Sequence, residues 1–146
     1  MGGMKMTSTG QLRRLALAVQ SMPRRVQKDA AEIAQRGIAA LIDDQFDAKR
    51  DPYGVTWKPP KDGGETMQKT GRLRRGFTVS IKPGSGQGLA LEISNREAYA
   101  KWLQSGTAKM EARRLVPGAA LPPAWQRVLA DAYKEALEKW YARIGS

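Results

Sequence analysis

A long apolar stripe runs through the C-terminal stretch of the chain, and every fold open to this sequence has to bury it. Apolar and aromatic side chains recur there at i, i+3 and i+4 spacing over about five helical turns. They are Trp125, Val128, Leu129, Ala132, Tyr133, Ala136, Leu137, Trp140, Tyr141 and Ile144. Pro122 and Pro123 precede the stripe, at a position where a helix does not need the backbone N–H. We therefore predict a C-terminal amphipathic helix whose stripe lies in the core or against another subunit.

The N-terminal part predicts a lead-in and two helices. Residues 1–10 are rich in Gly, Ser, Thr and Met, which is typical of a flexible segment. A short helix is expected over Gln11–Gln20, since its apolar residues share one helical face. Pro23 suits the first turn of a second helix, whose apolar pattern fades near Phe46. The apolar positions of that second helix are Val26, Ala30, Ile33, Gly37, Ile38 and Leu41.

Two strands are predicted in the second half of the chain. Phe77–Ile81 and Leu89–Ile93 alternate apolar and polar residues around the Gly-rich stretch 82–88, which indicates a β-hairpin. The glycines could instead form a phosphate-binding loop, but their spacing differs from that of a P-loop and no helix-opening Gly-Lys-Ser/Thr follows. A short helix over Arg96–Gln104, stopped by Gly106, and an extended segment over Lys109–Pro117 complete the prediction.

These elements predict a single α+β domain over residues 11–146. A small antiparallel sheet is expected to pack against the N-terminal and C-terminal amphipathic helices, with a long extended loop over residues 47–70. Turn-forming clusters such as 51–54 and 62–64 fill that loop. Tyr53 and Trp57 lie within it, so part of the loop is expected to dock on the chain's own core or on a neighbour. A chain of 146 residues is long enough to fold without a disulfide or a metal.

The absence of two residue types removes many enzyme classes. The chain has no Cys and no His, so thiolate nucleophiles, Cys-rich zinc sites and His-based triads are excluded. We expect no catalytic residue, no metal and no cofactor. The one acidic cluster leaves an alternative open, because carboxylates can hold Mg²⁺ for phosphoryl transfer. Its members are Asp43, Asp44, Asp47 and Asp51, and their other interpretation is surface decoration at the end of a helix.

The chain is strongly basic. It has 25 Lys plus Arg against 14 Asp plus Glu, a formal net charge of +11. The basic residues are densest at Lys49, Arg50, Lys58, Lys61, Lys69, Arg72, Arg74 and Arg75, with a second group at Lys101, Lys109, Arg113 and Arg114. Tyr53, Trp57, Phe77 and Trp102 interleave with them, a composition that suits single-stranded nucleic acid. Acidic protein partners, or solvated loops around a subunit interface, account for the same charge. No transmembrane segment and no secretory signal are expected.

Three stretches together resemble the phage virion morphogenesis family, which includes tail-completion and neck proteins. Residues 51–57, Asp-Pro-Tyr-Gly-Val-Thr-Trp, are similar to its turn-plus-Trp motif. Residues 70–75, Thr-Gly-Arg-Leu-Arg-Arg, resemble its Thr-Gly-x-Leu element, which precedes a strand. Residues 99–113 resemble its Tyr-Ala…Gly-Thr…Lys-Met-x-Ala-Arg stretch. The family usually continues from that Arg into Pro-Phe-Leu, whereas this chain reads Arg-Leu-Val-Pro over residues 114–117.

The resemblance implies a small α+β subunit that assembles into a ring, commonly of six copies. Such a ring completes the tail or neck and joins the tail to the DNA-filled head, around the channel through which DNA leaves. The implied subunit-interface residues are Tyr53, Trp57, Trp102 and Arg113, with Trp57 as an intersubunit anchor. The basic residues implied to face acidic partner proteins or DNA in the lumen are Lys49, Arg50, Lys58, Lys61, Arg72, Arg74 and Arg75. The expected partners are further copies and other neck, connector and tail proteins, with the virion as location and the host cytoplasm during assembly.

Overall fold

The computed structural model describes residues 11–17, 22–58, 71–84, 88–108 and 112–145. Its elements are β1 (Gln11–Leu17), α1 (Arg24–Ala48), α2 (Arg72–Arg75), β2 (Phe77–Pro83), β3 (Leu89–Asn95), α3 (Ala100–Ser105) and α4 (Pro123–Ile144). The predicted α+β class is confirmed, with a three-stranded antiparallel sheet and long helices near both ends of the described chain. The predicted lead-in over residues 1–10 lies outside the described residues.

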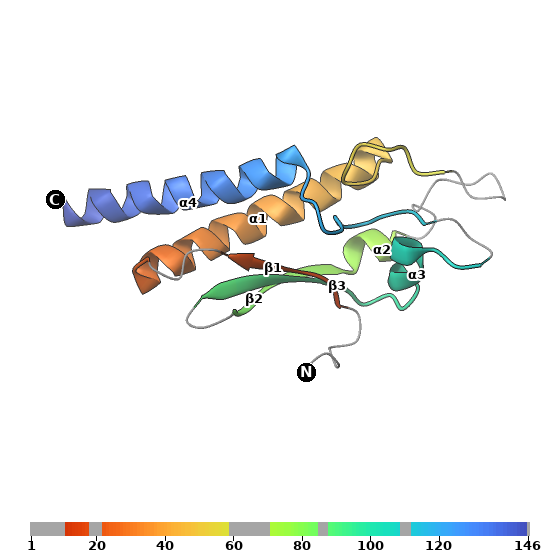
Figure 1. The fold of residues 1–146 in the computed structure, drawn as a ribbon, viewed down its shortest axis with the longest axis horizontal. Coiled ribbons are helices and arrows are strands. Elements are labelled where there is room, and N and C mark those ends of the chain that lie inside the picture. Colours follow the sequence, from red (N-terminus) through yellow and green to blue (C-terminus); the bar gives the residue numbers. More distant parts are fainter. Residues whose placement is uncertain (1–10, 18–21, 59–70, 85–87, 109–111, 146) are drawn as a thin grey trace.

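Helix α1 is the central layer of the molecule. It lies between α4, which runs in the opposite direction, and the sheet (Figure 1). Its buried residues include Val26, Ala30 and Ala34, whose small side chains let neighbouring elements approach closely. A Cβ added at Gly37 would lie 2.5 Å from Cγ1 of Val128, so this glycine fixes the spacing between α1 and α4. A residue larger than glycine at this position would push the two helices apart.

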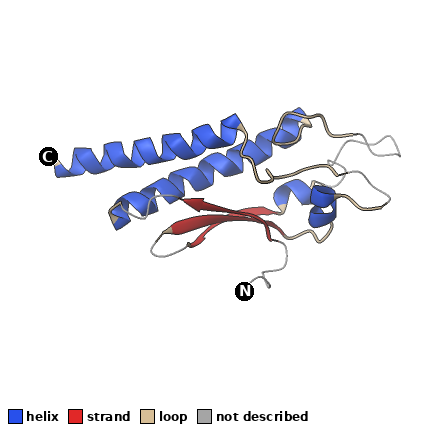
Figure 2. Cartoon of the chain, in the orientation of Figure 1, coloured by secondary structure: helices blue, strands red, loops and turns tan. Residues whose placement is uncertain are grey.

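The sheet has the strand order β1-β3-β2 (Figure 2). In the central row of its buried face, Leu91 of β3 pairs with Leu15 of β1 and with Ile81 of β2. Strand β3 is therefore the middle strand, and four of its residues, Leu89–Leu91 and Ile93, are buried hydrophobic residues. The hairpin that the alternating pattern predicted is confirmed as β2 and β3.

The predicted helix over Gln11–Gln20 is wrong, because residues 11–17 form strand β1. Leu15 and Leu17 are buried while Arg14 and Ala16 are exposed, which is the period-two pattern of a strand with one face in the core. Apolar residues at positions 12, 15 and 16 fit one face of a helix equally well. Pairing with a neighbouring strand therefore decides whether this segment is a helix or a strand. Pairing with β3 supplies the backbone hydrogen bonds and covers an edge that β3 otherwise leaves open.

The other boundaries differ from the predictions by a few residues. Helix α1 ends at Ala48, followed by Lys49 in the left-handed conformation at φ 57°, and Pro23 caps its start rather than entering the first turn. Helix α3 begins at Ala100, four residues later than expected, and ends before Gly106 as predicted. The C-terminal helix is confirmed as α4. Part of the predicted extended loop and the middle of the Gly-rich stretch, residues 59–70 and 85–87, lie outside the described residues.

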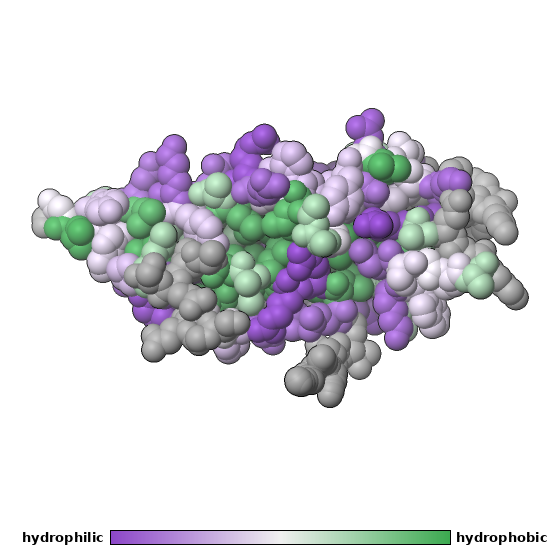
Figure 3. Space-filling view, in the orientation of Figure 1, coloured by the Kyte–Doolittle hydropathy of each residue, from purple (hydrophilic) through white to green (hydrophobic). Residues whose placement is uncertain are grey.

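The largest side chains of the core gather near the carboxyl end of α1. Phe46 contacts Trp57 and Phe77 in edge-on geometry, with ring centroids 5.2 and 6.0 Å apart. Leu115 and Trp125 are buried in the same cluster. Apolar residues also show along the middle of the face in Figure 3, with hydrophilic residues along both edges. In the part of the chain described here, no helix has the length and apolar character needed to cross a bilayer.

Candidate functional site

The turn that follows α1 is built by one aspartate. Oδ1 of Asp51 accepts hydrogen bonds from the backbone N–H groups of Tyr53 (2.8 Å) and Val55 (2.9 Å). Gly54 supplies the positive φ of 89° that the turn needs, and its N–H donates to the carbonyl of Asp51. Sequence order Asp-Pro-Tyr-Gly-Val therefore encodes a fixed turn, the first of the three family-like stretches.

The two aromatic residues of this turn bind the segment that precedes α4. The Tyr53 hydroxyl donates to the carbonyl of Ala120 at 2.5 Å and accepts from the N–H of Gly118 at 2.9 Å. The indole Nε1 of Trp57 donates to the carbonyl of Arg114 at 2.9 Å, and the Trp57 side chain is only 3% exposed. Of the two alternatives for the loop aromatics, docking on the chain's own core is the one observed. The expectation that Trp57 is an intersubunit anchor is corrected, because its ring has almost no surface left for a neighbour.

The second family-like stretch contributes Leu73 to the buried cluster that also holds Trp57 of the first. Gly71, at φ 70°, leads into α2, and Leu73 of α2 is buried. The side-chain Nδ2 of Asn95 donates to the carbonyl of Leu73 at 2.8 Å, while its Oδ1 accepts from the N–H of Glu97. Asn95 thus joins the end of β3 to α2 and to the turn that precedes the third stretch. Thr70 lies outside the described residues.

Arg74 of α2 forms ion pairs with two carboxylates near the end of α1. Its Nε lies 2.6 Å from Oδ1 of Asp43, and its Nη2 lies 2.9 Å from Oδ1 of Asp47. The guanidinium also lies 5.9 Å from the ring centroid of Phe46. The hydrogen bond from Arg74 lowers the pKa of the Asp43 carboxyl, and the same bond raises the pKa of Arg74. Arg74 thus binds two exposed carboxylates of its own chain, and the expectation that it faces a partner or DNA stays a prediction.

The ion pairs of Arg74 also argue against a magnesium site at the acidic cluster. Asp43 and Asp47 do share one face of α1, as the sequence suggested, but a guanidinium occupies that face. Among the residues described, no group of three or more Asp and Glu side chains is placed to hold a metal ion.

The third family-like stretch presents an exposed aromatic pair. Trp102 on α3 is 51% exposed, and Tyr99 just before α3 is 39% exposed. Leu103 of α3 is buried, and its carbonyl accepts from the N–H of Arg113 at 2.7 Å. Arg113 is held in turn, because its Nε donates to the carbonyl of Lys58 at 2.9 Å. Residues 109–111 lie outside the described residues.

Most of the predicted basic residues are exposed around this end of the molecule. They are Lys49, Arg50, Lys58, Arg72 and Arg75. The guanidinium of Arg72 lies 3.7 Å from Glu97 at an exposed position. Lys61 lies outside the described residues.

Sequence reasoning missed three side-chain amides, buried or partly buried, that hold the site together. They are Gln45, Asn95 and Gln104. The side-chain oxygen of Gln104 accepts from the N–H groups of Leu115 and Val116, at 2.7 and 3.0 Å, so it fixes the segment before α4. Gln45 was detectable in principle, since a polar residue beside Phe46 interrupts the apolar face of α1. The other two follow only from the tertiary arrangement.

No family model, no curated protein and no solved structure matches this chain. The likeness to the virion morphogenesis family accordingly depends on the three stretches themselves.

Proposed function

We propose that this chain is a structural subunit of a phage neck or tail-completion ring. Copies of it, commonly six in the family it resembles, join the tail to the DNA-filled head around the channel through which DNA leaves. Its role is assembly rather than catalysis. Its place is the neck or the head-proximal end of the tail, and the host cytoplasm before assembly.

The observation that carries this proposal is the convergence of the three family-like stretches. Trp57 of the first stretch binds the carbonyl of Arg114, directly after the third. Arg113 of the third binds the carbonyl of Lys58, directly after the first. Asn95 connects the second stretch to Glu97, two residues before the third. Stretches far apart in sequence therefore form one connected end of the molecule, as expected if a shared function rather than chance unites them.

This end also has the composition of a protein interface. Trp and Tyr are enriched in interfaces because each buries a large area with few rotatable bonds. Trp102 and Tyr99 expose their rings there, and Arg113 is held in place by two hydrogen bonds. The exposed basic residues around them suit acidic partner proteins or DNA in the lumen.

The test is genetic and structural. Particles produced without this protein are expected to appear in electron microscopy as separate filled heads and tails. Supplying the wild-type chain should restore joined virions. Normal, infectious virions in its absence would rule out the proposed role.

A second candidate function is binding of single-stranded nucleic acid. It is favoured by one observation, the half-exposed ring of Trp102 next to the exposed Lys101, since bases stack on aromatic rings beside cations. A salt titration separates the two functions. Affinity for DNA that falls steeply with salt and is reduced by Trp102→Ala supports this candidate, and no affinity at low salt removes it.

A further inference from the structure

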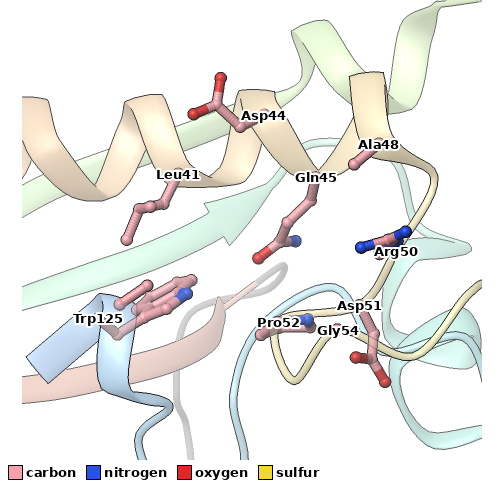
Figure 4. Close-up of a pocket in the computed structure, with 10 residues that line it drawn as sticks. Leu41, Asp44, Gln45, Ala48, Arg50, Asp51, Pro52, Gly54 and Trp125 are labelled. Atoms are coloured by element: carbon pink, nitrogen blue, oxygen red, sulfur yellow. The ribbon is translucent and has the colours of Figure 1, made fainter.

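Two open features of the surface have no part in the contacts described so far. The first is a hollow between the carboxyl end of α1 and the first turn of α4 (Figure 4). It carries charges of both signs, from Asp44, Asp51 and Arg50. Its Gln45 amide is turned to the carbonyl of Leu115, so the hollow selects no particular ligand. The second feature is the outer edge of β1, and its backbone groups can accept a further strand.

The hydrogen bonds of the sheet show which groups of β1 point outward. The N–H of Arg96 donates to the carbonyl of Gly76, so this pair and every second pair after it join β2 to β3 by hydrogen bonds. Positions 94, 92 and 90 of β3 therefore bond to β2, and positions 93, 91 and 89 bond to residues 13, 15 and 17 of β1. The backbone N–H and C=O groups of Arg14 and Ala16 consequently point away from the sheet (Figure 2).

Most of these outward groups are unpaired in the part of the chain that the structure describes. The carbonyl of Arg14 accepts from Nη1 of Arg13 at 2.6 Å. The N–H of Arg14 and both backbone groups of Ala16 have no partner among the described residues. Ala16 is exposed, whereas Ala90, which is paired with it on the middle strand, is only 1% exposed. An incoming strand can therefore reach the groups that it must bind.

The opposite edge of the sheet, along β2, is protected. The carbonyl of Val79 accepts from Nε2 of Gln35 on α1 at 2.6 Å. Pro83 ends the strand without an N–H, and its carbonyl accepts from the guanidinium of Arg14. The structure thus favours β1 over β2 as the edge that accepts another strand.

The charge at this edge selects the occupant. Strand β1 carries two adjacent arginines and no acidic residue. The Arg13 guanidinium lies at the edge itself, because it binds the exposed carbonyl of Arg14. Arg14 lies 3.9 Å from the carboxylate of Glu92, which leaves an excess of positive charge. The same strand of a second copy would bring two more arginines, and like charges on paired strands are destabilising.

We propose that the outer edge of β1 binds an extended acidic segment of a partner protein by strand addition. The backbone of the segment exchanges hydrogen bonds with Ala16 and accepts from the N–H of Arg14. Its carboxylates pair with the guanidinium groups of Arg13 and Arg14. Residues 11–17 lie outside the three family-like stretches, and the proposal does not depend on the proposed ring.

The direct test is an NMR titration of the full chain with a capped hexapeptide of alternating Glu and Val. The backbone N–H groups of Arg14 and Ala16 are expected to shift, to saturate and to become protected from hydrogen exchange. The N–H of Leu15, which already bonds to β3, should gain little protection. An absence of saturable shifts at Arg14 and Ala16 overturns the proposal.

Two control peptides separate charge from strand pairing. A peptide with Gln in place of Glu should bind at least about threefold more weakly, because an exposed ion pair contributes up to about 1 kcal/mol. The Glu peptide methylated on every backbone amide keeps its charge but cannot donate to the edge, so it should give no protection at Ala16. Equal affinity of either control peptide overturns the proposal.

Variants locate the site. Ala16→Pro removes the outward N–H without removing a bond to β3, and it should abolish peptide binding, whereas Ala16→Val should retain it. Arg14→Gln should weaken binding about threefold, and Arg127→Gln, the same change of charge at an exposed position on α4, should leave it unchanged. Unchanged binding by a folded Ala16→Pro variant contradicts the assignment. The methylated peptide makes the same comparison on the wild-type chain if that variant does not fold.

Hydrogen exchange of the free chain tests the other occupants of the edge. The proposal predicts that the N–H of Ala16 exchanges as fast as those of exposed loops until the peptide is added. Protection that increases with protein concentration would place a second copy at the edge. Protection that is independent of concentration would place a segment of the same chain there, and either result overturns the proposal.

Discussion

Trp57 links the turn after α1 to the core through both its ring and its N–H. It packs edge-on against Phe46, and its indole N–H donates a partly buried hydrogen bond to the carbonyl of Arg114. Trp57→Ala is therefore expected to lower the free energy of unfolding of the single chain by about 3–5 kcal/mol, because it leaves a large cavity and an unpaired carbonyl.

Urea unfolding of the dispersed protein measures this change. Trp102→Ala is the matched control, since half of that ring is already in water, and a loss below about 1 kcal/mol is expected. Similar losses for the two variants would contradict the burial of Trp57.

The ion pairs of Arg74 predict a pH dependence of stability. Because the pKa of Asp43 is lowered in the folded chain, its contribution is fully present above the ordinary Asp pKa of about 3.9. That contribution is lost as the pH falls through the lower folded value. Both carboxylates are exposed, so the effect is small and weakens with salt.

Asp43→Asn should flatten the acid limb of the stability curve below about pH 4, measured by urea unfolding at low salt. Asp44→Asn is the control, since Asp44 forms no ion pair with a described residue. If both variants have the same acid limb as the wild type, the ion pairs of Arg74 contribute nothing to stability.

At the level of elements, the close contact between α1 and α4 depends on Gly37, which has no side chain. An alanine at an exposed helical position is about 1 kcal/mol better than glycine, so propensity alone predicts that Gly37→Ala stabilises α1. The new Cβ would lie 2.5 Å from Val128, so we expect a loss of about 1–3 kcal/mol in thermal or urea unfolding.

The double variant Gly37→Ala with Val128→Ala distinguishes the clash from a change in helix propensity. Removing the Val128 methyl groups relieves the contact, so the double variant should be more stable than the sum of the two single changes predicts. Additive losses would show that the helices do not meet at this point.

The long helices and the hairpin are predictable from sequence because each carries its own periodic pattern. Strand β1 is not predictable in this way, because the apolar residues of 11–17 fit both the helical and the strand period. Pairing with β3 makes the segment a strand. The turn at Asp51 is also readable locally, whereas the inward position of Trp57 depends on the carbonyl of Arg114, far along the chain. The sequence likewise does not reveal which basic residues form ion pairs within the chain. Arg74 does so because Asp43 and Asp47 lie on one face of α1 beside it.

For the whole molecule, the exposed aromatic pair and the far end of α4 offer a matched comparison. Trp102 belongs to the end formed by the family-like stretches. Tyr141, 63% exposed, lies in the last turn of α4, and that end of α4 is at the opposite tip of the molecule (Figure 1). If the proposed ring forms through the first end, Trp102→Ala should weaken assembly by about 2 kcal/mol or more, roughly thirtyfold in the association constant, as for a buried interface tryptophan.

Sedimentation equilibrium over a range of protein concentrations measures this change. Tyr141→Ala should leave assembly unchanged, and each variant should lose less than about 1 kcal/mol in urea unfolding because at least half of each ring is in water in the single chain. Assembly that responds to Tyr141 and not to Trp102 would move the interface to the carboxyl end of α4. The convergence of the three stretches would then be a feature of the fold alone.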